Sequence, residues 1–295
     1  GLYGTNVYEL SLPDNTFYFS GYVWLRWSNP DLDPVSGLEF VNAVETWGLM
    51  LTPLTESPEQ LANGDFVQTL SVQGRFYKSF KLNDYPLDRQ TLSIMLEDTT
   101  NTIDAIQYRA DNEKSGLDPN FRVQGFEVLG LSAQNYEHSY GTDFGYTGTD
   151  AAQVYSTLEF QIQVERNPNL FIWKLLFPLL LVLITNWLTL LINPTHVEVR
   201  TAMPATALLT TVFLQQTALE SISQTSVLVL MDKVYLVAYA AIVVTLIQVI
   251  RDNFKVKTAS DEEVSSVHAA DKVSLVIQVT VSVVALAALI LPKLL

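Results

Sequence analysis

The sequence contains no cysteine, so it can form neither a disulfide framework nor a thiol-based active site. Its first half also has few basic residues: residues 1–168 hold 23 Asp and Glu against 9 Lys and Arg, whereas residues 169–295 hold 8 of each. The net charge of −14 therefore belongs to the first half. Because like charges repel, this part is not expected to bind nucleic acid or anionic lipid, and it should raise the local concentration of cations.

The first half also lacks the motifs that mark enzymes. It has no nucleophile elbow, no phosphate-binding loop and no metal-ligand spacing. Its single histidine, His138, stands in a polar stretch, where we expect a solvated loop residue. We therefore expect no catalytic residue, no metal ion and no cofactor, and we do not expect an enzyme.

Short alternating or β-branched runs are present in the first half instead. They begin at Thr16, Phe66, Gln90, Phe121 and Tyr155, and Asn, Asp, Pro and Gly cluster between them. Many short strands without a long helical period predict an antiparallel, immunoglobulin-like β-sandwich over the first 168 residues.

One segment of the predicted sandwich, Asn135–Gln153, is long and rich in glycine. It carries four aromatic residues, which are Tyr136, Tyr140, Phe144 and Tyr146. Exposed rings on a loop can cap a small ligand, especially a cation that lies against their faces. Alternatively, the segment is a hairpin tip whose rings pack on their own sandwich, and the sequence leaves both interpretations open.

The second half contains four apolar runs, each long enough to cross a lipid bilayer. They cover about 170–193, 198–220, 227–250 and 272–292. The sequence therefore predicts a membrane domain of four helices over residues 169–295, following the sandwich.

The basic residues beside these runs predict their orientation. Arg251, Lys255 and Lys257 follow the third run, and Arg200 opens the second, so the positive-inside rule places the sandwich and both chain ends outside the cell. We expect an integral protein of the plasma or inner membrane, with a periplasmic sandwich if the cell is Gram-negative. No signal peptide is visible at Gly1, so a mature or trimmed chain is expected.

The second apolar run, from His196 to Glu220, is unusually polar for a membrane span. It carries five threonines, two glutamines and a glutamate near each end. At 100° per residue, one helical face collects acidic, small, hydroxyl, apolar and amide side chains within roughly 80°. This predicted stripe consists of Glu198, Ala202, Thr206, Leu209, Phe213, Gln216 and Glu220. Identical copies arranged in a ring could enclose water, with this stripe facing it. Acidic rings together with an apolar constriction select and gate cations.

An alternative for this run is a helix buried in a polytopic bundle, its hydroxyl groups bonded to neighbouring helices. Thr211 and Gln215 lie off the stripe, which keeps this alternative open. Arg200 is about 200° from Glu198 on the helical wheel. We therefore expect Arg200 to face away from the stripe, toward the cytoplasm or a neighbouring subunit.

Several motifs have a fixed spacing. The stretch DYPLDRQTL places Tyr85, Pro86, Asp88 and Gln90 in the order aromatic-Pro-x-Asp-x-Gln. In addition, Arg166 precedes a proline of the first apolar run by twelve residues, and that run contains a tryptophan.

Together, the predicted sandwich, the four spans and these motifs resemble the pentameric ligand-gated ion channels of the Cys-loop receptor superfamily. The resemblance covers essentially the whole chain. The two cysteines that name the superfamily would fall at Lys78 and Leu92, so the sequence is most similar to the prokaryotic members.

The resemblance implies a homopentamer in a lipid bilayer that conducts monovalent cations when a small molecule or a change of pH acts on the sandwich. The agonist is not identified by the sequence. Tyr85, Pro86, Asp88 and Arg166 are implied to couple sandwich to pore, with an ion pair between Asp88 and Arg166. A non-conducting, membrane-anchored receptor for small molecules is the alternative.

The resemblance also indicates where a ligand would bind. The loop that matches the family's central binding loop, Glu97–Asn101, has no aromatic residue, so a receptor for the usual amine transmitters is not expected. The candidate ligand residues are Tyr22, Glu97, Tyr136, Tyr140, Phe144, Tyr146 and Tyr155.

Overall fold

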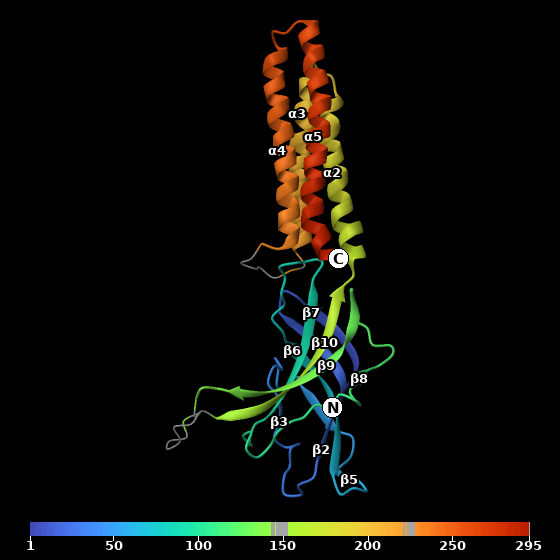
Figure 1. Ribbon diagram of the computed structural model, residues 1–295, viewed down its shortest axis with the longest axis vertical. Helices are drawn as coiled ribbons and strands as arrows, with labels where there is room; N and C mark the ends of the chain where they lie inside the picture. The colour runs from blue at the N-terminus through green and yellow to red at the C-terminus, as the bar shows by residue number, and fades with distance from the viewer. Residues whose placement is uncertain (143–144, 146–152, 221, 223–227, 295) are drawn as a thin grey trace. The chain divides into compact units, whose positions relative to one another are not determined.

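The computed structural model describes residues 1–142, 145, 153–220, 222 and 228–294 and divides into two compact units (Figure 1). The first unit comprises Gly1–Phe80 and Arg89–Arg166 and consists of strands. The second comprises Lys81–Asp88 and Asn167–Leu295 and consists mainly of helices.

The first unit is a β-sandwich, as the sequence predicted. Its strands are β1 (Leu2–Ser11), β2 (Thr16–Trp27), β3 (Leu38–Phe40), β4 (Met50–Pro53), β5 (Glu59–Gln60), β6 (Phe66–Tyr77), β7 (Arg89–Asp98), β8 (Gly116–Leu117), β9 (Phe126–Ser139) and β10 (Val154–Arg166). One sheet has the order β4-β6-β2-β1-β8, with β5 beside β6, and the other has the order β3-β7-β10-β9. The strand pairs are antiparallel except β1 with β8.

The long strands bury alternate residues, as the two-residue period of a strand requires. Phe17 and Phe19 of β2 and Phe76 of β6 are completely buried, and the rings of Phe17 and Phe76 stack at 5.8 Å. Leu92 of β7 and Phe160 of β10 are buried in the same way on the other sheet. The run expected to start at Phe121 becomes regular strand only at Phe126, after the turn at Gly125 with its positive φ.

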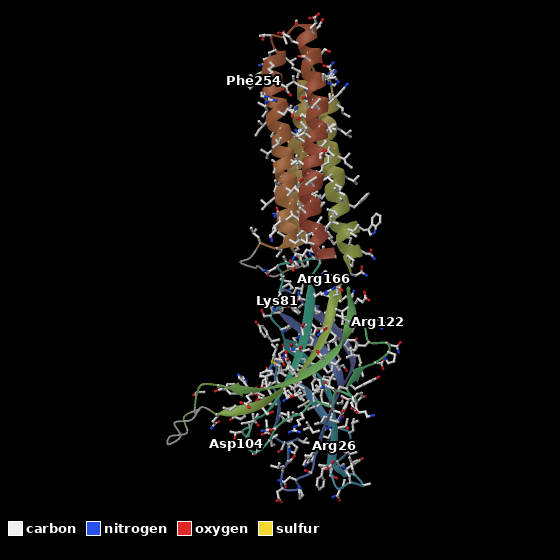
Figure 2. The ribbon with its side chains drawn as sticks, in the orientation of Figure 1. Arg26, Lys81, Asp104, Arg122, Arg166 and Phe254 are labelled. Carbon is white, nitrogen blue, oxygen red and sulfur yellow. The ribbon has the colours of Figure 1, made fainter. Side chains whose placement is uncertain are left out.

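The second unit is a bundle of four long helical spans. Its elements are α1 (Pro168–Leu170), the π-helix η1 (Phe171–Leu176), α2 (Phe177–Leu188), the 3₁₀ turn η2 (Thr189–Leu191), α3 (Val197–Leu219), α4 (Leu230–Val256) and α5 (Asp261–Leu294). Within the described residues, four spans are long and apolar enough to cross a membrane, and α3 is the least apolar of them. Apolar side chains project outward from the helices, including Phe254, which is 71% exposed (Figure 2). The chain is therefore an integral membrane protein.

Helix α5 begins eleven residues before the predicted fourth span, at Asp261. Hydropathy missed this first part because it is polar, but its residues suit a helix start. The carboxylate of Glu263 accepts a hydrogen bond from the Ser260 amide at 2.7 Å, and Asp261 and Glu262 add negative charge to the first turn. The polar residues 251–271, between the third and fourth predicted spans, are therefore mostly helical.

The segment Lys81–Asp88 belongs to the helical unit, although it connects β6 and β7. Asn83 and Tyr85 accept hydrogen bonds from the amides of Leu230 and Met231, at the start of α4, at 3.0 and 3.2 Å. Tyr85 is buried, and the Tyr85–Pro86 peptide bond is cis. The loop that carries the aromatic-Pro-x-Asp-x-Gln motif is thus held by the helices.

Candidate functional site

The predicted stripe of α3 is uncovered in the single chain. All seven stripe residues are exposed, and the side chains of Leu209 and Phe213 each keep 58% of their surface. The opposite face is buried and consists of Arg200, Pro204, Ala207, Thr211 and Ala218. Helix α3 therefore packs on its own chain through one face and presents a face with carboxylate, hydroxyl and amide groups to its surroundings.

Thr211 and Gln215, two of the polar residues that lie off the stripe, have partners inside the chain. Thr211 is buried and donates to the Ala207 carbonyl at 2.8 Å. Gln215 accepts a hydrogen bond from the Tyr239 hydroxyl at 2.7 Å and donates to Asp232 at 3.4 Å. Neither side chain therefore needs to face the stripe to be satisfied. The alternative of a helix buried on all sides within its own bundle does not agree with the exposed stripe.

Arg200 faces away from the stripe, but neither toward the cytoplasm nor toward a neighbouring subunit, as the sequence had suggested. It is buried inside its own chain, where its guanidinium donates to Asp271 of α5 at 2.6 Å. The wheel gave the direction correctly. It could not give the partner, because Asp271 is 71 residues away along the chain.

In the sandwich, several candidate ligand residues gather around the carboxylate of Glu97, at the end of β7. This side chain is buried and accepts hydrogen bonds from Tyr140 at 2.7 Å and from Thr157 at 2.6 Å. His138 Nδ1 lies 2.6 Å from the same carboxylate. The ring of Tyr140 packs edge-on against that of Tyr155, with centroids 5.7 Å apart, and lies 4.2 Å from the His138 ring.

The register of the sheet explains this Glu97 cluster. Tyr155 pairs with His138 and Thr157 pairs with Tyr136 across β10 and β9, so these four side chains share one face of the sheet. Leu158 pairs with Leu96 across β10 and β7, and the next residues along the two strands, Thr157 and Glu97, are joined by their side-chain hydrogen bond. Sequence reasoning missed His138 and Thr157, and it placed His138 in a loop although it lies on β9. Only the strand pairing could have shown that they meet Glu97.

The electrostatics of this face keep Tyr140 neutral and Glu159 ionised. Burial, the hydrogen bond to Glu97 and the charges of Glu97 and Glu39 raise the pKa of Tyr140, so its hydroxyl stays a donor. Burial alone would raise the pKa of Glu159, but hydrogen bonds from Ser93, Gln134 and Gln161 and the charge of Lys78 outweigh it and lower this pKa. The face therefore combines negative charge with aromatic rings, a combination that suits a small cation.

The remaining ligand candidates are placed differently. Tyr136 lies on the same face as the Glu97 cluster, with its hydroxyl 4.0 Å from the sulfur of Met95. Tyr22 is exposed on β2, in the other sheet, and does not join the cluster within one chain. Phe144 and Tyr146 lie outside the described residues.

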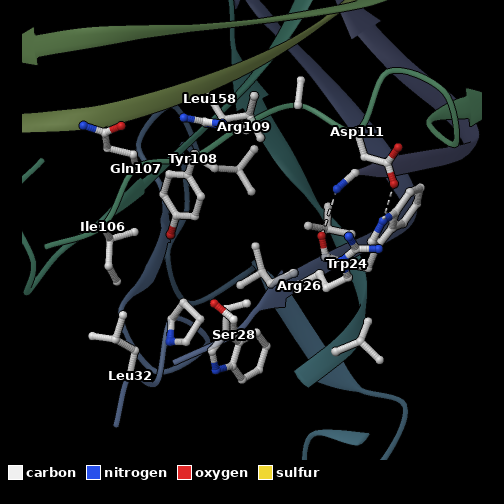
Figure 3. Close-up of a pocket in the computed structure, with 18 of the residues that line it drawn as sticks. Trp24, Arg26, Ser28, Leu32, Ile106, Gln107, Tyr108, Arg109, Asp111 and Leu158 are labelled. Atoms are coloured by element: carbon white, nitrogen blue, oxygen red, sulfur yellow. Dashed lines mark hydrogen bonds between the residues drawn. The ribbon is translucent and has the colours of Figure 1, made fainter. Parts of the chain in front are cut away.

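A cavity of about 820 Å³ lies elsewhere in the sandwich (Figure 3). Trp24, Arg26, Ile106 and Tyr108 are among its lining residues, and none of the five described ligand candidates lines it. Two of its polar side chains are engaged, because the Trp24 indole donates to Asp111 at 3.3 Å and Arg26 pairs with Asp65 at 3.3 Å. The hydroxyl of Tyr108, in contrast, is buried and has no hydrogen-bond partner among the described residues.

The predicted coupling residues are divided between the two units. Tyr85, Pro86 and Asp88 are in the loop held by the helices, and Asp88 is buried. Arg166 is the last residue of β10, and its guanidinium carbon lies 4.4 Å from the centroid of the Phe126 ring.

Comparison with known proteins gave no assignment: no protein-family model and no curated protein matches the chain. Over the residues that the structure describes, no three His, Cys, Asp or Glu side chains are grouped so that they could hold a metal ion. The family resemblance therefore rests on the motifs and on a β-sandwich followed by four membrane helices.

Proposed function

We propose that five copies of the chain form a cation-selective ion channel, opened by a small molecule or a change of pH that acts on the β-sandwich. The observation that carries the proposal is the arrangement of α3. All seven residues of the predicted stripe are exposed, while the opposite face of the helix is buried in the chain. A charged side chain that faces hydrocarbon costs roughly 3 kcal/mol, whereas the same group facing water in a central pore costs little.

The stripe supplies the parts that a cation pore needs. Copies of Glu198 would form an acidic ring at one mouth, where converging carboxylates attract cations and turn anions away. Leu209 and Phe213 would form apolar rungs that stop ions by excluding water when they converge. Thr206 already bonds its hydroxyl to the Ala202 carbonyl at 2.9 Å, so its oxygen remains available as an acceptor toward the pore.

The sandwich would supply the sensor. The Glu97 cluster joins β7, β9 and β10, so a ligand that competes for the Tyr140 hydroxyl would disturb three strands at once. Tyr22, on the other sheet, would reach such a ligand only from a neighbouring copy. Tyrosine rings and nearby carboxylates favour small organic cations as ligands.

Recording from the purified chain in planar lipid bilayers tests the proposal. Unitary, cation-carrying currents are expected during pH steps or with a panel of small organic amines. A chain that binds one of these amines and never conducts would be a membrane-anchored receptor, and the channel proposal would be wrong.

The absence of cysteine provides a matched test of the pore face. A thiol reagent should block the current of Thr206→Cys, whose side chain is exposed, and leave Thr211→Cys unaffected, because that side chain is buried on the opposite face. Equal block of both variants would show that α3 does not line the pore with this stripe.

A further inference from the structure

Two opposite charges lie close together at the start of α3 but in different environments. Glu198 is exposed on the stripe, whereas Arg200, the fourth residue of the helix, is buried. If both charges faced water at the same mouth, a ring of arginines would offset the attraction that a ring of glutamates exerts on cations. The location of Arg200 therefore matters for ion selectivity.

Arg200 is held in its buried position by side chains of α4 and α5. Asp271 of α5 accepts its hydrogen bond at 2.6 Å, and the other carboxylate oxygen of Asp271 accepts a hydrogen bond from Gln248 of α4 at 2.7 Å. Asp252 of α4 is buried as well and interacts electrostatically with both Arg200 and Asp271. Asp271 is thus the direct partner of Arg200, and Asp252, which also lies 3.9 Å from Arg251, is the second acidic group near this pair.

Gln248, which donates to Asp271, is itself held in place by further hydrogen bonds. The amide oxygen of Gln248 accepts hydrogen bonds from Ser274 at 2.5 Å and from Gln278 at 2.9 Å. Gln278 in turn accepts from Thr245 at 2.8 Å, and Thr245 accepts from Asn186 of α2 at 2.9 Å. A continuous polar chain therefore runs from the pore helix through α5 and α4 to α2.

A buried ion pair of this kind adds little net stability over apolar residues of similar size, so stability alone does not account for it. Without its acidic partners, an arginine one turn from a helix end would extend toward the nearest water to keep its charge solvated. Arg200 is in the first turn of α3, so the nearest end of the bundle is the one where Glu198 is exposed.

We propose that Asp271, together with Asp252, determines charge selectivity by holding Arg200 away from the water at the mouth of the pore. The inference rests on the proposed channel function, and it assigns a specificity role to two residues that are not on the stripe. Neither residue touches the permeating ion, so both act through the position of Arg200.

Reversal potentials in asymmetric salt test this role. In Asp252→Asn/Asp271→Asn, the cation-to-anion permeability ratio should fall by roughly threefold or more, because a positive charge is freed beside each Glu198. Asp271→Asn alone should give a smaller fall, since Asp252 remains. Adding Arg200→Gln to the double variant should restore the wild-type ratio, and a purely structural role of the aspartates would not give this rescue. The matched control is Asp261→Asn, an exposed acid of α5 that should leave the ratio unchanged.

A chemical measurement keeps the test independent of conduction. Phenylglyoxal, which modifies arginines accessible to water, should leave Arg200 unmodified in the wild-type chain and modify it in the double variant, as read by mass spectrometry. If the double variant does not assemble, Gln248→Leu removes the donor to Asp271, together with the acceptor for Ser274 and Gln278, and should increase the modification of Arg200 to a smaller extent.

The outcomes separate the two proposals. A wild-type chain that carries no current contradicts the channel function, whatever the labelling shows. A conducting double variant with wild-type selectivity contradicts the role of Asp271, and so does an Arg200 that is modified equally in wild type and variants.

Discussion

Glu198 and Glu220 mark opposite ends of the exposed face of α3, and we predict that they contribute unequally to permeation. Two carboxylates about 10 Å apart in water repel by roughly 0.4 kcal/mol, and by more in a narrow mouth of lower dielectric constant. Glu198→Gln should therefore lower conductance and weaken cation preference. Glu220→Gln should do so only slightly, because salt and water screen it at a wide outer end.

Single-channel conductance and reversal potentials in asymmetric salt measure both effects. A Glu198→Gln variant with wild-type conductance and reversal potential would mean that the stripe is misassigned by at least one helical position.

Tyr140 should make the stability of the sandwich depend on alkaline pH. Its pKa is raised above the ordinary value of about 10, so the folded chain binds its proton more tightly than the unfolded chain does. The resulting stability is present below about pH 10 and is lost as the pH rises from there through the raised pKa. Tyr140→Phe should cost about 1 kcal/mol at neutral pH and should lose less stability than the wild type above pH 10.

Thermal unfolding midpoints of the detergent-solubilised chain at pH 8 and pH 11 check this. Tyr77→Phe, at an exposed tyrosine of β6, is the control. A wild-type pH dependence in Tyr140→Phe would show that the hydrogen bond to Glu97 is not the cause.

At the scale of elements, the apolar rungs of α3 are predicted to be the gate. Leu209→Thr should make the channel leaky at rest, because a hydroxyl group at a constriction keeps water and ions in it. Leu208→Thr makes the same chemical change about 100° away on the helix, at a less exposed position, and should leave the resting current close to wild type. If resting current and activation are unchanged in Leu209→Thr, the gate lies at another rung such as Gln216.

The exposed face of α3 could be predicted from the sequence because successive residues of a helix are rotated by a fixed angle. That angle alone places the stripe residues from Glu198 to Glu220 on one face. The long strands beginning at Thr16 and Phe66 were predictable because alternation over twelve residues is a strong local signal. Strands of two to four residues, such as β5 and β8, carry too few side chains to show a period.

The contacts that bring distant segments together could not be predicted. Glu97 meets Thr157 across 60 residues, and Arg200 meets Asp271 across 71. No local period in the sequence predicts contacts between residues this far apart along the chain, because these contacts depend on which strands pair and which helices pack. The early start of α5 was missed for a different reason, since a polar but well-capped helix has no hydropathy signal.

At the scale of the whole molecule, we predict five copies. Native mass spectrometry of the detergent-stripped complex should give about 165 kDa, five times the 33.0 kDa chain. A monomer would leave the carboxylates of the exposed stripe facing lipid, at the roughly 3 kcal/mol per charged group that such exposure costs. A mass corresponding to one chain or to another number of chains would contradict the pentamer.

Coupling between sandwich and pore is predicted to require Asp88 and Arg166. Replacement of either by Ala should shift or abolish activation by the pH step or amine that opens the wild type, while binding to the sandwich persists, because a rigid sensor must transmit its movement to the helices. Recordings at matched surface expression, combined with binding measurements, test this. Wild-type activation in both variants would remove these residues from the coupling path.

The segment Lys81–Asp88 limits how the sandwich and the helical unit can be exchanged between related chains. A graft that transplanted residues 1–166 intact would bring a foreign loop to the start of α4, where Asn83 and Tyr85 bond the helix backbone. A working chimera should instead keep the recipient's Lys81–Asp88, with junctions after Phe80, Asp88 and Arg166. A single recombination point in the gene cannot produce that arrangement. The sandwich and the helical unit should therefore be inherited together, unless the loop is compatible with the helices of both parent chains.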